Sequence, residues 1–149
     1  MRTAREILQQ ASTIAVVGAS PDKFSEAHWM PTQLQQFGWR VIPVNAHADL
    51  IFGERCYARL IDIHEPVDIV DIFDTPEDAA EIVREAIGIG AHAVWWEPHS
   101  PHAPRSDDAR HIAAEAGVDY IENDGVAMQR AIGCMVCNNA PHGQVACAG

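Results

Sequence analysis

A short polar turn carries the residues of this chain that are best suited to chemistry. Gly18, Ala19 and Ser20 directly follow the first apolar run. Glycine allows close approach of a ligand to the backbone, and two N–H groups and a hydroxyl after it are hydrogen-bond donors. Lys23 adds a mobile positive charge, and Ser25 is placed to cap a helix, whose N-terminus favours anions. These residues predict a site for a phosphate group.

Two features of a standard dinucleotide site are missing around this turn. The NAD fingerprint is G-x-G-x-x-G, whereas the turn reads GASPDK and lacks the second and third glycines. An NAD site also needs a carboxylate at the end of the second strand to hold the ribose hydroxyls. The second apolar run ends at Asn45, and no acid follows before Asp49. Both differences argue against NAD as the ligand.

Short apolar runs at regular intervals supply the elements that must position the turn. They are rich in β-branched and aromatic residues, and they predict strands at 13–17, 41–44, 67–73, 93–96 and, more weakly, 118–121. Helical patterns lie between them at 3–10, 25–37, 76–90 and 107–116. This alternation predicts an α/β protein with a Rossmann-like, doubly wound, mostly parallel five-stranded sheet in three α/β/α layers.

The length and the cysteines bound the domain organisation. The 149 residues suffice for one domain, which we predict over 1–133, followed by a loosely ordered tail over 134–149. Three of the four cysteines, Cys134, Cys137 and Cys147, lie in this tail. Their spacing is that of a partial zinc site without the second ligand pair of a strong motif, so we predict free thiols and no metal.

The charge and hydropathy of the chain exclude several classes of partner. A net charge of -11 repels nucleic acid and anionic membranes, and no basic stripe offsets it. No apolar run is long enough to cross a bilayer. The charged, amphipathic N-terminal segment is unlike a secretory signal, so we predict a cytoplasmic protein.

Five segments, in this order and spacing, resemble the small bacterial coenzyme A-binding proteins. They read VGAS with a lysine shortly after, GWRVIPVN, GERCYARLIDI, EPVDIVDIF and IGAHAVWW. The domain of this family also stands at the N-terminus of succinyl-CoA synthetase α-like chains, and the resemblance extends over 10–122. It implies a Rossmann-like fold that binds coenzyme A (CoA).

The resemblance also implies which residues contact CoA. Those beside the pyrophosphate are Gly18, Ala19 and Ser20, with Lys23 close to the phosphates. Those on the adenosine side and at the end of the third strand are Pro43, Val44, Asn45, Phe73 and Asp74. An uncharged Asn45 suits CoA because a carboxylate there would repel its 3′-phosphate.

The main prediction is therefore a protein that binds CoA or acyl-CoA without catalysis of its own, as a monomer or weak homodimer. One alternative is an NAD(P)- or ATP-binding enzyme or redox sensor that uses the same crevice. Another is an interaction domain with a vestigial site, which Asp74 supports because the family usually has arginine there. No nucleophile and base can be paired from the sequence, so no reaction is predicted.

Overall fold

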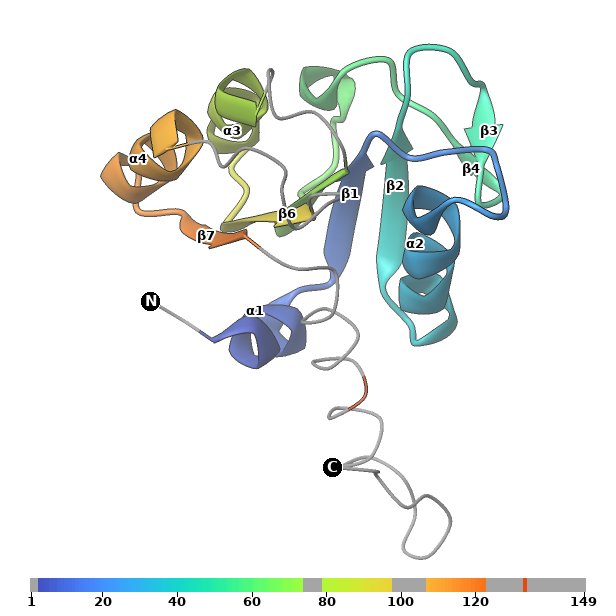
Figure 1. Ribbon diagram of the computed structural model, residues 1–149, viewed down its shortest axis with the longest axis horizontal. Helices are drawn as coiled ribbons and strands as arrows, with labels where there is room; N and C mark the ends of the chain where they lie inside the picture. Colours follow the sequence, from blue (N-terminus) through green and yellow to red (C-terminus); the bar gives the residue numbers. More distant parts are fainter. Residues whose placement is uncertain (1–2, 74–78, 98–106, 123–132, 134–149) are drawn as a thin grey trace, which may run out of the picture.

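A five-stranded parallel sheet forms the centre of the molecule in a computed structural model, which describes residues 3–73, 79–97, 107–122 and 133 (Figure 1). The spatial order is β2-β1-β5-β6-β7, and every neighbouring pair is parallel. The strands are β1 (Thr13–Val17), β2 (Arg40–Val44), β5 (Ile69–Phe73), β6 (Ala93–Glu97) and β7 (Asp119–Glu122). This confirms the predicted α/β fold and all five predicted strands, four of them with ends shifted by one or two residues.

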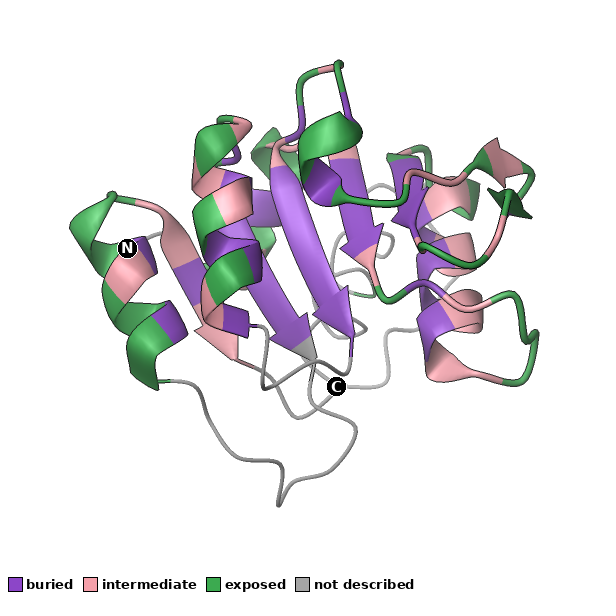
Figure 2. Ribbon diagram, turned by 90° about the horizontal axis from the view of Figure 1, so that it is seen from above, coloured by how far each residue is buried: buried purple, intermediate pink, exposed green. Residues whose placement is uncertain are grey.

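Helices cover both faces of the sheet, so β2, β1, β5 and β6 are almost entirely buried, whereas the edge strand β7 is mostly half-buried (Figure 2). One face packs against α1 (Ala4–Gln10) and α2 (Glu26–Gln36). The other packs against the 3-10 helix η1 (Leu60–Asp62), α3 (Ala79–Gly88) and α4 (Asp107–Glu115). After β1 the chain forms β2 on one side of β1, and it then crosses to form β5 on the other side of β1. The strand order therefore reverses at β1, and crevices for ligands form at the carboxyl ends of strands around such a reversal.

Consecutive residues of each strand enter opposite layers of the core. Trp95 packs in the layer of α1 and α2, and Trp96 packs in the layer of α3 and α4. Both indoles are at most 1% exposed, so they fill the core. Asp71 is a fully buried acid on the α1/α2 face, where its neighbours across the sheet are Val16 and Trp95.

A small hairpin outside the main sheet was not predicted. Its strands are β3 (Leu50–Ile51) and β4 (Glu54–Arg55), each too short to leave a periodic pattern. The two residues between them, Phe52 and Gly53, have φ angles of 58° and 72°. Two positive φ angles are typical of a type I′ hairpin turn, in which phenylalanine is an unusual first residue.

Two of the predicted features fall outside the described residues. These are the start of the third helix at Pro76, and the tail over 134–149 with its three cysteines. In the described ranges, no helix combines the length and the apolar character that a bilayer crossing needs.

Candidate functional site

The turn after β1 lies tightly against the end of β5. Gly18 has a φ angle of +82°, and a Cβ atom at this position would stand 2.4 Å from the Phe73 carbonyl oxygen. Only glycine therefore fits here without moving the backbone. The structure thus brings Gly18 and Phe73 together, as expected for the ends of adjacent parallel strands.

Two backbone donors of the turn are used inside the protein, and the second of them was expected to face a ligand. The Gly18 N–H donates to the Val44 carbonyl at 3.2 Å, and the Ser20 N–H donates to the Ala27 carbonyl at 3.3 Å. The expectation that the Ser20 amide is free is therefore corrected. The Ala19 N–H donates to none of the residues that the structure describes. The Ser20 hydroxyl accepts a bond from the Asp22 N–H at 3.1 Å and keeps its own proton to donate.

Asn45 joins the turn after β1 to the chain that leaves β2. Its Nδ2 donates to the Ala19 carbonyl at 2.8 Å, and its Oδ1 accepts from the His47 N–H at 2.7 Å. Its own N–H donates to the Tyr57 carbonyl at 2.9 Å. These three bonds keep an uncharged side chain at the end of β2, with one amide proton left over.

Pro43 and Val44, expected beside the adenosine, are buried. The Pro43 carbonyl accepts from the Tyr57 N–H at 3.1 Å, and the Val44 carbonyl accepts from Gly18. These two buried residues therefore support the surrounding backbone through their carbonyl groups and expose little surface of their own.

The start of α2 differs from the expected cap. Ser25 is the N-cap residue, but its side chain makes no capping hydrogen bond. Asp22 closes the preceding turn instead, because its Oδ1 accepts from the Phe24 N–H and its carbonyl accepts from the Ser25 N–H, both at 3.0 Å. The Ser25 hydroxyl is therefore not needed by the helix. Lys23 is exposed and makes no ion pair with the described residues.

Sequence reasoning missed two residues of this region, Phe24 and His28. Phe24 is 94% exposed at the tip of the turn, and its apolar side chain among polar neighbours was the available signal. His28 lies in the first turn of α2 with Nδ1 2.7 Å from the Ser20 carbonyl oxygen. The sequence left the orientation of His28 open because either face of the helix was possible. Asp74 lies outside the described residues.

The described residues of this region form neither a nucleophile–base pair nor a metal site. The His28 nitrogen that contacts Ser20 faces the backbone carbonyl and not the hydroxyl, so this pair is not a nucleophile with its base. Within the described ranges, no three His, Cys, Asp or Glu side chains gather to hold a metal ion.

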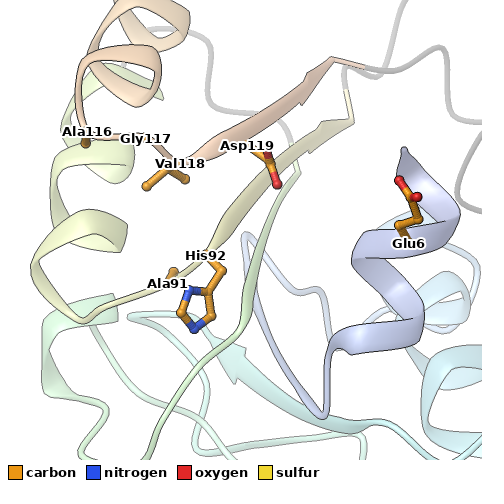
Figure 3. Close-up of a pocket in the computed structure, with 7 residues that line it drawn as sticks. All are labelled: Glu6, Ala91, His92, Ala116, Gly117, Val118 and Asp119. Atoms are coloured by element: carbon orange, nitrogen blue, oxygen red, sulfur yellow. The ribbon is translucent and has the colours of Figure 1, made fainter. Parts of the chain in front are cut away.

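A hollow lies at the opposite end of the sheet (Figure 3). It has a volume of about 650 Å³ and is lined by Glu6, Ala91, His92, Ala116, Gly117, Val118 and Asp119. Its ionisable residues are two acids and a histidine, and the C-terminal end of α4 adds a negative partial charge. The Glu6 carboxylate also accepts from Thr3 N–H and hydroxyl groups at 2.7 and 3.0 Å. This hollow therefore does not suit a phosphate ligand.

Solved structures of similar proteins share this architecture. A hypothetical protein from Pyrococcus horikoshii OT3 is 34% identical, with 85% of each chain covered and a TM-score of 0.77. A protein from Thermus thermophilus is also 34% identical, with 85% of this chain and 95% of that chain covered and a TM-score of 0.75.

Curated relatives and a family match extend the comparison. The uncharacterised protein YneT of Bacillus subtilis (strain 168) is 33% identical over 91 residues, which are 61% of this chain and 67% of that protein. An ADP-forming acetate–CoA ligase of Methanocaldococcus jannaschii is 28% identical over 60 residues, but only 8% of its length is covered. The family described as "CoA binding domain" matches residues 12–130. With most of the chain inside that match and the expected fold around the turn, the protein belongs to the CoA-binding domain family.

Proposed function

We propose that this protein binds CoA or an acyl-CoA at the carboxyl ends of β1 and β2 and does not itself catalyse a reaction. Membership of the CoA-binding domain family supports the ligand. The observation that carries the location is the turn after β1, where Gly18 brings the backbone against β5 and leaves the Ala19 N–H without a described partner. The ligase reaction of the longer relative is not part of this proposal.

Donors of the turn would hold the pyrophosphate. The Ala19 N–H and the Ser20 and Ser25 hydroxyls are available for phosphate oxygens, and the N-terminus of α2 adds a favourable partial charge. Lys23 is the only lysine in the sequence, and it lies in this turn although the chain as a whole is strongly acidic. Its ammonium group would neutralise part of the phosphate charge.

Asn45 would mark the adenosine side of the ligand. Its side chain is uncharged and is fixed by bonds to Ala19 and His47, so no carboxylate stands at the end of β2 to repel a 3′-phosphate. NAD lacks that phosphate and ordinarily uses an acid at this place. The same residue therefore favours CoA over NAD.

Calorimetry and thermal unfolding with CoA, acetyl-CoA, NAD and ATP test the proposal. We expect CoA and acetyl-CoA to raise the melting temperature, and Lys23→Ala to reduce this shift while the ligand-free melting temperature stays unchanged. The single lysine also allows a direct readout. Reductive methylation with labelled formaldehyde marks Lys23 and the terminal amine alone, and CoA should shift the Lys23 methyl resonance.

Other outcomes would replace the proposal with one of its alternatives. Binding of NAD or ATP in preference to CoA would indicate a different nucleotide-binding protein. Absence of binding by all four compounds would contradict the proposal. Binding restored by Asp74→Arg would then identify a vestigial site.

A further inference from the structure

Both backbone polar groups of Ser20 are held by the beginning of α2. The Ser20 N–H donates to the Ala27 carbonyl at 3.3 Å, and the Ser20 carbonyl lies 2.7 Å from Nδ1 of His28. A residue in the middle of a ligand-binding turn is thereby fixed at both of its peptide groups. The two partners are adjacent in sequence, so one turn of helix supplies both contacts.

Pro31 explains why the Ala27 carbonyl is available. In a regular helix this carbonyl would accept from the N–H four residues later, which is at position 31. Proline has no N–H and its ring crowds the same carbonyl. Pro31 lies inside α2 and is buried. The missing helical bond is therefore matched by the bond from Ser20, which comes from outside the helix.

The contact from His28 assigns a donor to its ring. A carbonyl oxygen only accepts, so Nδ1 carries a proton and donates it to Ser20. The ring is supported on its other side by Phe52, with centroids 5.1 Å apart and planes at 61°. Gln35, two helical turns further along, donates to the Phe52 carbonyl at 3.2 Å and keeps this hairpin residue against α2.

We propose that Pro31 and His28 are positioning residues for the ligand-binding turn. Pro31 frees the Ala27 carbonyl for the Ser20 N–H, and His28 holds the Ser20 carbonyl through its Nδ1 proton. Together they orient the Ser20 hydroxyl and the neighbouring Ala19 N–H towards the phosphates. The effect on affinity rests on the proposed function of CoA binding, whereas the fixing of Ser20 is measurable without any ligand.

Replacing the proline tests whether the missing N–H at position 31 is what leaves the Ala27 carbonyl open to Ser20. In Pro31→Ala the new N–H competes with Ser20 for the Ala27 carbonyl. We expect the Ser20 amide to exchange with solvent about five- to tenfold faster, and CoA affinity to fall by a similar factor, which is the scale of one neutral hydrogen bond. The new amide at position 31 should itself be protected. Pro66→Ala, at an exposed proline outside the turn, is the matched control and should change neither quantity.

Two variants of the histidine separate its donor from its ring. The Nδ2 of asparagine lies as many bonds from the backbone as Nδ1 of histidine, so His28→Asn keeps the donor and loses the ring. His28→Phe keeps a ring against Phe52 and loses the donor. We expect His28→Asn to retain wild-type Ser20 exchange and CoA affinity within about threefold, and His28→Phe to show the five- to tenfold loss of both.

The pattern of exchange and affinity decides the inference. Unchanged Ser20 exchange in both Pro31→Ala and His28→Phe would overturn it, as would faster exchange with unaltered CoA affinity. A wild-type protein that binds no CoA would contradict the proposed function. The fixing of Ser20 by α2 would in that case be judged on the exchange rates alone.

Discussion

The two ends of the sheet differ in both shape and chemistry. At the carboxyl ends of β1 and β2, Gly18 and Asn45 organise a tight turn through neutral hydrogen bonds, with Lys23 beside it. At the amino ends of β6 and β7, the chain leaves a hollow of about 650 Å³ beside Glu6 and Asp119. This hollow thus lies at the end whose charge does not suit a phosphate group.

The two ends therefore differ in what they offer a phosphate group. A phosphate needs fixed donors and a local positive potential more than it needs a large cavity. The carboxyl end has both because the β1 strand leads into the N-terminus of α2. The amino end receives the C-termini of α3 and α4, which carry the opposite partial charge.

The largest effect is expected from two glycines at opposite ends. Gly18→Ala introduces a Cβ 2.4 Å from the Phe73 carbonyl at a φ of +82°, and should reduce the free energy of unfolding by about 3 kcal/mol. Gly117→Ala has a similar φ of +71° with nothing within 4 Å, so it should cost only about 1 kcal/mol. Urea unfolding measures both.

Binding should follow the same contrast. Gly18→Ala should abolish the CoA-dependent rise in melting temperature, whereas Gly117→Ala should preserve it. Equal costs at the two positions would show that the approach of β1 to β5 is looser than the structure has it.

A smaller effect is expected from side-chain donors that hold backbone carbonyls. Asn45→Ala loses the bonds to Ala19 and His47 and should destabilise the fold by about 1–2 kcal/mol. Trp39→Phe removes Nε1, which donates to the Leu8 and Ala11 carbonyls at 3.2 and 3.1 Å near the amino end of β1. Trp39→Phe should reduce the free energy of unfolding by a similar amount. Calorimetry should find weaker CoA binding only for Asn45→Ala, and equal losses of affinity would remove the distinction between the two ends.

The smallest effect on stability is expected from lowering the pH, which removes an ion pair at the amino end of β2. A hydrogen-bonded ion pair joins Arg40 to Glu65, and the guanidinium holds the pKa of Glu65 below its ordinary value. The carboxylate therefore adds stability at neutral pH, and this contribution disappears as the pH falls below about 4.3, the pKa of an unperturbed glutamate. Since the two side chains are 47% and 35% exposed, the contribution should stay below about 1 kcal/mol.

Glu65→Gln isolates that contribution. The difference in unfolding free energy between wild type and this variant should be measurable at pH 7 and should shrink towards zero at pH 3. A difference that grows on acidification would contradict the assignment. The neutral bonds around Asn45 should show no such dependence.

The fold was predictable because its determinants are local and periodic. Buried parallel strands are apolar almost throughout, as Ile14–Val17 and Val41–Val44 are, and helices between them end at glycines with positive φ such as Gly38 and Gly90. The β3–β4 hairpin was missed because two-residue strands carry no period, and because Phe52 stands where asparagine or glycine is usual.

For the candidate site, the sequence predicted which turn is suited to a phosphate group but not which of its groups stay available. The short loop after β1 indicated phosphate chemistry from Gly18 and Lys23. Which groups stay available for a ligand depends on contacts between distant segments. The Ser20 amide is taken by a carbonyl that Pro31 leaves open, and the Asn45 side chain reaches across to Ala19. Residue types and spacing do not contain such pairings.

The adjacent indoles of Trp95 and Trp96 give this molecule two internal optical probes. Because each side chain sits in a different layer of the core, a variant that keeps one of them emits from the α1/α2 side and a variant that keeps the other emits from the α3/α4 side. With the remaining tryptophans replaced, stopped-flow fluorescence of such a pair would time the loss of each layer separately. The same experiment would reveal whether the layer beside the turn after β1 loosens before the other.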